Sequence, residues 1–223
     1  MVSWIGVEVA DDEFAQDVAD RCAFFNGAEF EDFGVVQHDL DGRAVAAGFV
    51  YVVAGVRPID ADQDLTRLAA LLLPGQRYLH WRDEPNARRR EIVAVLNEIA
   101  LDIAVAVAVD VRPRRQEHAR AICLAHVVSE ALAAALPVTA VAIESRGAQL
   151  DERDRYTIRD ELRRLDRHAA PTIEFVTKTA SPLLWIADAV TSMASAHFSE
   201  APRSDYWWRS LRPNRLIIRR ADH

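Results

Sequence analysis

The chain has 223 residues, half of them hydrophobic and 27% charged, with a formal net charge of −7. This length suits one α/β domain with a single core, the hydrophobic fraction excludes a disordered chain, and the acidic balance argues against a protein that coats nucleic acid through net positive charge. Because no apolar run reaches the roughly 18 residues of a membrane span and the first residues lack a signal peptide's basic start and cleavage site, we expect a cytoplasmic protein that does not enter the membrane.

In the first half of the chain, short β-rich runs alternate with longer amphipathic segments, a pattern typical of a layered α/β structure. The predicted strands are residues 3–9, 33–39, 45–53 and 77–80. The predicted helices are residues 12–25, 60–73 and 84–100. The step from Asp41 to Gly42 is a hairpin signal, so the second and third of these strands are expected to pair.

The second half repeats this alternation. Its predicted strands are residues 103–109, 138–143, 172–176 and 216–219. Its predicted helices are residues 115–136, residues 151–167 and an apolar helix that begins at Pro182. Because no internal repeat or linker interrupts the pattern, we expect one domain over residues 31–223, preceded by an N-terminal extension at residues 1–30.

The most informative feature of this half is an aspartate inside an apolar run. Ser181 is a typical N-cap and Pro182 a typical first helical residue, so the run up to Val190 should form a buried helix around Asp188. A buried carboxylate is costly unless it is paired, protonated or bound to a metal. Glu144 ends a β-branched run in a similar way, and the two acids together suggest a metal site.

Two further acids occupy positions where ligands commonly bind in α/β proteins. Asp39 ends a predicted strand beside the hairpin, and Asp154 lies in the first turn of the helix after Glu144. Because ligands bind at strand ends in such sheets, we expect Asp39, Glu144, Asp154 and Asp188 to converge. Mg²⁺ or Mn²⁺ suits an oxygen-only site, and a pair of these ions would assist hydrolysis of a phosphodiester.

Several other catalytic chemistries lack their motifs in this sequence. Cys22 and Cys123 have no partner at metal-ligand spacing, so both are expected to be reduced and buried. The chain has no Gly-rich phosphate loop, no Gly-x-Ser-x-Gly elbow and no His-Glu-x-x-His helix. The sequence therefore favours carboxylate chemistry.

Two passages resemble the family called domain of unknown function 3800. Residues 173–188, IEFVTKTASPLLWIAD, are similar to its closing strand, its polar loop and the helix that carries an Ala-Asp pair. Residues 78–90, YLHWRDEPNARRR, are similar to its His-containing strand and basic helix, especially in actinobacterial relatives. The resemblance covers residues 33–220.

This resemblance implies a ribonuclease-H-like mixed sheet flanked by helices, and metal-dependent phosphodiester chemistry. By position, Asp39 would be the metal ligand of the first strand, Glu144 the acid of a later strand, Asp154 the helix acid and Asp188 the final ligand. The family carries Asp-Glu-Ser or Asp-Glu-Thr on its first strand, near the N-terminus, whereas this chain offers Asp39, Leu40 and Asp41.

Each candidate also has a structural interpretation. His80, Glu84 and Lys178 would contact substrate. Alternatively, His80 would be a partly buried structural histidine, Lys178 a solvated loop lysine and Asp39 a hairpin residue. An arginine could pair with Asp188 or Glu144, and helix capping alone explains an acid at Asp154. Two functions remain open: a Mg²⁺- or Mn²⁺-dependent nuclease acting on RNA or DNA, and a non-catalytic ribonuclease-H-like module that binds nucleic acid, a protein partner or a second copy of the chain.

Overall fold

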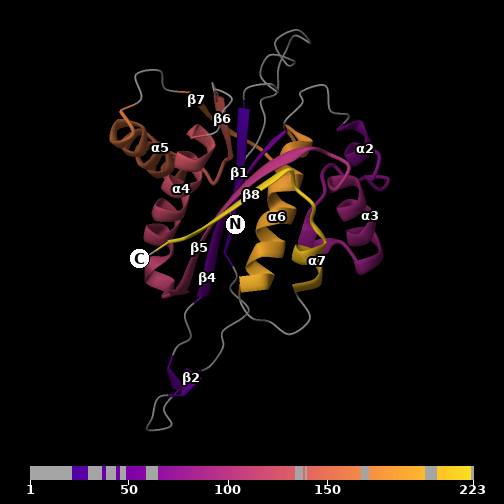
Figure 1. The fold of residues 1–223 in the computed structure, drawn as a ribbon, viewed down its shortest axis with the longest axis horizontal. Coiled ribbons are helices and arrows are strands. Elements are labelled where there is room, and N and C mark those ends of the chain that lie inside the picture. Colours follow the sequence, from indigo (N-terminus) through magenta and orange to yellow (C-terminus); the bar gives the residue numbers. More distant parts are fainter. Residues whose placement is uncertain are drawn as a thin grey trace.

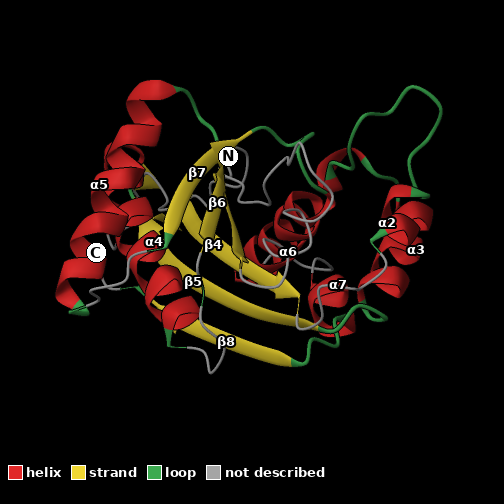
Figure 2. Ribbon diagram, turned by 90° about the horizontal axis from the view of Figure 1, so that it is seen from above, coloured by secondary structure: helices red, strands yellow, loops and turns green. Residues whose placement is uncertain are grey.

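The computed structural model describes residues 22–29, 37–38, 44–45, 49–58, 65–133, 138, 140–166, 171–198 and 205–221. These residues form a mixed α/β structure in which a six-stranded sheet has helices on both faces (Figure 1, Figure 2). Among the described residues, no helix is long and apolar enough to cross a membrane.

The six strands of the main sheet run in the order β7-β6-β1-β4-β5-β8. Their bounds are β1 Cys22–Glu29, β4 Phe49–Pro58, β5 Leu101–Val111, β6 Ala140–Glu144, β7 Thr172–Val176 and β8 Arg215–Arg220. Strands β1, β4 and β5 form an antiparallel series. Strand β6 is parallel to β1, β7 is parallel to β6, and β8 is parallel to β5. The carboxyl ends of β6 and β7 therefore lie side by side, and we call this end of the two strands the sheet edge.

The central strands are buried on both faces because their side chains alternate between two apolar cores. In β5, Val105 and Val107 belong to the core beneath α6 (Pro182–Phe198), whereas Ala106 and Ala108 belong to the core beneath α4 (Gln116–Leu132). In β4, Val52 and Val53 divide in the same way. Because both faces of β4 and β5 are buried, consecutive residues in these strands must be apolar, which explains their continuous Val- and Ala-rich sequence.

The helices divide between the two faces (Figure 2). Besides α6, the first face carries α2 (Thr66–Ala69), η1 (Trp81–Asp83), α3 (Asn86–Leu96) and α7 (Asp205–Ser210). The second face carries α4 and α5 (Ala148–Arg164), which pack together, with η2 (Pro113–Arg115) leading into α4.

The structure corrects three predicted elements. Residues 22–29, placed by the sequence in a helix and an N-terminal extension, form β1 in the middle of the sheet, since β4 and β6 pair with its two edges. Of the predicted helix at 60–73, the structure describes residues 65–73, and within these the helix covers Thr66–Ala69, because the chain then tightens into i→i−3 turns. The predicted strand at 77–80 is a loop. The next backbone N–H, that of Trp81, donates a hydrogen bond to the Asp188 side chain and not to a neighbouring strand.

The hairpin prediction is confirmed where β2 (Gln37–His38) pairs antiparallel with β3 (Ala44–Val45). Residues 49–53 of the predicted strand at 45–53 belong instead to β4, which pairs with β1 and β5. The predicted strand at 172–176 is confirmed residue for residue. The later helices and strands agree with the sequence to within a few residues at each end. The predicted strand at 3–9 lies outside the described residues.

Cys123 should resist thiol reagents in the native protein. Its side chain is fully buried on α4, and this burial raises the pKa of the thiol to about 12, although the Ala108 backbone and the Arg120 charge act in the opposite direction. Since the thiolate is the reactive form, we expect negligible iodoacetamide labelling at pH 8 and complete labelling in urea. Mass spectrometry of the peptide that contains Cys123 separates it from Cys22, and rapid native labelling would contradict the expectation.

Candidate functional site

The apolar helix α6 places Asp188 at the edge of the sheet where β6 and β7 end. The helix begins as the sequence predicts, because the Ser181 hydroxyl accepts a hydrogen bond from the Leu183 backbone at 3.2 Å. The loop before it is held by Trp185, whose indole Nε1 donates to the Lys178 carbonyl at 2.9 Å. A further bond, from the Ser145 backbone to the Val176 carbonyl at 2.8 Å, joins the ends of the two strands.

Three groups surround the carboxylate of Asp188, which is 0% exposed. Lys178 Nζ lies 3.0 Å from Oδ1, and the Trp81 backbone N–H donates to Oδ2 at 3.0 Å. His80 Nδ1 lies 3.4 Å from the same Oδ2. Asp188 therefore meets a cation, a backbone donor and an imidazole, as a buried charge requires.

This environment keeps Asp188 ionised. Burial alone would raise the pKa of the carboxyl, but the facing His80 imidazole and the Lys178 ammonium outweigh burial and lower the pKa to about 2. At neutral pH the described part of the site thus contains an anionic Asp188 held by Lys178.

Glu144 approaches the same lysine from the end of β6. Its Oε2 lies 4.0 Å from Lys178 Nζ, so the ammonium is within reach of two carboxylates from different elements. The Tyr78 ring completes the surroundings of Lys178, with its centroid 5.9 Å from Nζ. The expected convergence of Glu144 and Asp188 therefore occurs, and Lys178 lies where they meet.

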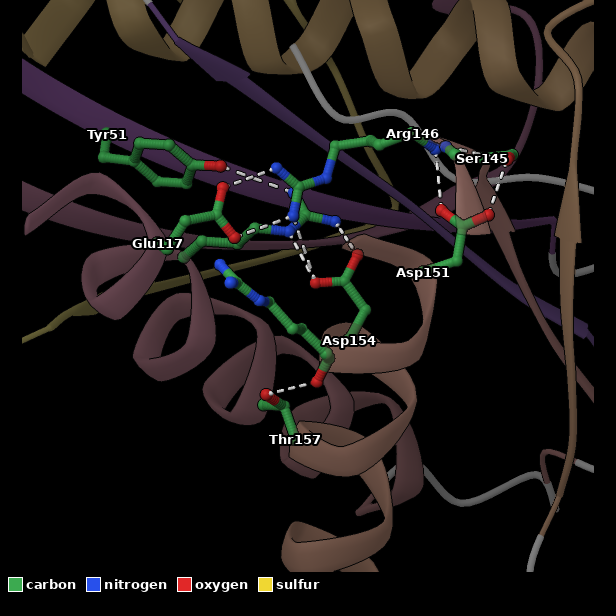
Figure 3. Close-up of polar contacts among 10 residues, drawn as sticks. Tyr51, Glu117, Ser145, Arg146, Asp151, Asp154 and Thr157 are labelled. Atoms are coloured by element: carbon green, nitrogen blue, oxygen red, sulfur yellow. Dashed lines mark hydrogen bonds and ion pairs between the residues drawn. The ribbon is translucent and has the colours of Figure 1, made fainter. Parts of the chain in front are cut away.

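Asp154 does not join them, because α5 covers the opposite face of the sheet. Its carboxylate forms a bidentate ion pair with the buried Arg120 of α4, through Nε at 2.7 Å and also through Nη2 (Figure 3). Arg146 Nη2 lies 3.4 Å from Asp154 Oδ1. The prediction that Asp154 shares the site of Asp188 is therefore wrong, since α5 places its carboxylate against Arg120 of α4, on the other face of the sheet.

The network around Asp154 fixes the loop that follows Glu144 (Figure 3). Arg146 pairs with Glu117 of α4 through two bonds of 2.7 and 3.0 Å. Asp151, in the first turn of α5, accepts bonds from the Ser145 hydroxyl at 2.6 Å and from the Arg146 backbone at 2.7 Å. These contacts join the end of β6 to α4 and α5, so they support the position of Glu144 from the far face.

Another predicted site residue, Glu84, has partners of its own. It is buried, and its carboxylate accepts a bond from Gln76 Nε2 at 2.7 Å and faces Arg88 Nε at 3.4 Å. It therefore holds the start of α3 in place. Asp39 lies outside the described residues.

The donor set allows a simpler metal site than the predicted four-acid arrangement. Within the described ranges, no three His, Cys, Asp or Glu side chains are grouped closely enough to hold a metal ion by themselves. Mg²⁺, however, is often bound through one or two carboxylates, with water and substrate phosphates supplying its other ligands. Glu144 and Asp188 are the two carboxylates that a single ion of this kind would use, and it would compete there with Lys178, whose ammonium lies 3.0 Å from Asp188 Oδ1.

The sequence did not reveal the site residues that belong to no recognisable motif. The Trp81 backbone N–H bonds Asp188 across 107 positions of sequence separation, and Tyr78 faces Lys178 only because the loop before η1 folds over α6. The arginine richness of the chain was the one available signal for Arg120 and Arg146. No family model matches the chain, and no curated protein or solved structure gives a match.

Proposed function

We propose that the chain is a ribonuclease-H-like domain that hydrolyses phosphodiester bonds with one divalent cation, Mg²⁺ or Mn²⁺. The strand order supports the fold: an antiparallel series β1-β4-β5 is continued beyond β1 by the parallel crossover strands β6 and β7, with helices on both faces. The resemblance leads us to expect a mixed sheet of this kind, although the central strand β1 precedes the residues 33–220 that the resemblance covers.

The observation that carries the proposal is the meeting of Glu144, Lys178 and Asp188 at one sheet edge. Strand ends and the helix that follows them are the usual places for ligands in such sheets. The two carboxylates are suitable ligands for a cation, and the lysine ammonium is suitable for binding a phosphate. We therefore assign hydrolysis to Glu144, Lys178 and Asp188 at this edge, and we assign a structural role to Asp154.

The residues of the site would act in distinct ways. Asp188 and Glu144 would hold the ion, which when bound activates water and neutralises phosphate charge. Lys178 would face the negative charge that develops on the phosphoryl oxygens. His80, which is partly exposed and has Nδ1 directed at Asp188, would accept a proton from water at Nε2.

Cleavage assays test this function directly. We expect purified protein with Mn²⁺ to cut labelled RNA, DNA or an RNA–DNA hybrid, and we expect Asp188→Asn and Glu144→Gln each to reduce cleavage to background. Asp160→Asn is the matched control, because Asp160 is 69% exposed on α5 and should leave cleavage unchanged. Equal cleavage by wild type and Asp188→Asn, or cleavage that persists in EDTA, would remove the metal-dependent proposal.

One observation favours the non-catalytic module as a second candidate. The Lys178 ammonium lies within reach of both carboxylates, where it balances part of the charge that a metal would otherwise neutralise. Thermal unfolding separates the two candidates, because a ligand that binds only the folded state raises its apparent stability. A Mn²⁺-dependent rise in melting temperature that Asp188→Asn abolishes supports the enzyme, whereas no rise for the wild type supports the module.

A further inference from the structure

A row of aromatic rings in mutual contact extends from the surface of α7 to η1, beside the candidate site. The Tyr206 ring meets the Trp207 ring edge to face, with centroids 4.9 Å apart, and Trp207 meets Trp81 in the same way at 5.8 Å. The Arg89 guanidinium lies 5.3 Å from the Trp81 ring centre. We call Tyr78, Trp81, Arg89, Tyr206 and Trp207 the aromatic surface.

The two ends of the aromatic surface are open to solvent, although its middle is packed. Tyr206 is 61% exposed and Tyr78 is 36% exposed, whereas Trp81 is buried in the core beneath α6. Helices α3 and α7 lie on the same face of the sheet as α6 (Figure 1). The exposed Tyr206 ring packs against Trp207, so it would lose little conformational freedom when a ligand stacks on it.

The aromatic surface is connected to the candidate site by direct contacts. Trp81 donates its backbone N–H to Asp188, and Lys178, the partner of Asp188, lies over the Tyr78 ring. Arg89 donates from Nε to the Trp81 carbonyl at 3.1 Å, which holds its guanidinium beside the ring. Exposed arginines, Arg82 on η1 and Arg209 on α7, belong to the same two elements as the rings.

We propose that the aromatic surface binds single-stranded nucleic acid, with a base stacked on Tyr206 and the backbone directed toward the exposed Tyr78 ring beside the candidate site. Stacking needs the open face of an unpaired base, and it tolerates any base because each has a π-face. The nearby arginines suit phosphates, which they contact through a planar, multi-donor group. Binding of the base does not depend on the proposed function. Only the direction of the nucleic-acid backbone, toward the candidate site, rests on it.

Fluorescence anisotropy without metal tests the binding separately from cleavage. Labelled oligothymidylate of about 20 nucleotides, longer than the roughly 4–16 nucleotides that such surfaces cover, is titrated with protein in EDTA at low salt. A blunt duplex and an abasic strand of equal length serve as comparison probes. We expect the base-containing single strand to bind at least fivefold tighter than either, and Tyr206→Ala to weaken its binding roughly five- to 150-fold.

Two variants make the result specific to this surface. Tyr206→Phe keeps the ring and should bind like the wild type. Tyr156→Ala removes a tyrosine that is 57% exposed on α5, on the opposite side of the sheet, and should change nothing. Equal binding of the abasic strand, an unchanged affinity in Tyr206→Ala, or no binding at all overturns the inference, and the last of these outcomes favours a protein partner for the aromatic surface.

The two proposals can fail separately. If the wild type binds single strands through Tyr206 but cuts nothing with Mn²⁺, the hydrolytic function is lost and the binding surface stands. If Mn²⁺-dependent cleavage requires Asp188 while Tyr206→Ala cuts and binds normally, the function stands and the binding surface is lost.

Discussion

Arg120→Met should lower the free energy of unfolding by about 3–5 kcal/mol. Arg120 is 1% exposed and Asp154 is 2% exposed, and the two form a bidentate ion pair between α4 and α5. Without Arg120, the buried Asp154 carboxylate would keep only the longer contact with Arg146 at 3.4 Å, and a poorly compensated buried charge is far more costly than the loss of the pair itself. Urea denaturation at pH 7 measures the change from the shift of the midpoint at constant slope.

The matched control is Arg163→Met on the same helix pair. Arg163 and Asp160 also form an ion pair, but their side chains are 72% and 69% exposed, so the change should cost less than about 1 kcal/mol. The double variant Arg120→Met, Asp154→Leu should recover most of the lost stability, because it removes both buried charges. A cost for Arg120→Met no larger than that for Arg163→Met would show that the buried network does not hold α4 and α5 together.

Asp188→Asn should make the stability of the protein less dependent on pH in the acidic range. The pKa of Asp188 is about 2 in the folded protein, against about 3.9 in an unfolded chain. Since the folded value is the lower one, ionised Asp188 stabilises the fold above about pH 4, and this contribution disappears as the pH falls toward 2. A shift of this size corresponds to about 2–3 kcal/mol at pH 7.

Urea denaturation of the wild type and of Asp188→Asn at pH 7 and pH 3 measures this contribution. The wild type should lose more stability between the two pH values than the variant does, and the variant should be the less stable protein at pH 7. Glu152→Gln is the control, because Glu152 is a half-exposed residue of α5 whose pair with Arg155 is a surface contact. Parallel pH profiles for wild type and Asp188→Asn would mean that Lys178 and His80 do not stabilise the carboxylate.

The sequence was most informative where one local signal agreed with the tertiary structure. The run at residues 172–176 is a strand because β-branched residues suit a strand that pairs with β6, and the Ser181 and Pro182 signals begin α6 as expected. An aspartate in an apolar helix indicated a paired buried charge, and Asp188 has this role. In each case, the sequence signal lies within a few residues of the feature that it predicts.

The remaining features depend on contacts that no local pattern encodes. Residues 22–29 have weak strand signals, and only pairing with β4 and β6 on both edges makes them a strand. Asp154 occupies a helix start that would suit either a metal site or a fold-stabilising pair. The packing of α5 on α4 decides between them by placing Arg120 beside it. The partners of Asp188 are likewise long-range, since Trp81 lies 107 positions away.

The place of β1 in the sheet bears on how the chain acquires its structure during synthesis. This strand leaves the ribosome before β6, and one of its edges stays without its partner until β6 is made, more than a hundred positions later. Pairings between such distant segments slow folding and leave strand edges exposed in the meantime. We therefore expect nascent chains that end before β6 to depend on chaperones until that strand arrives.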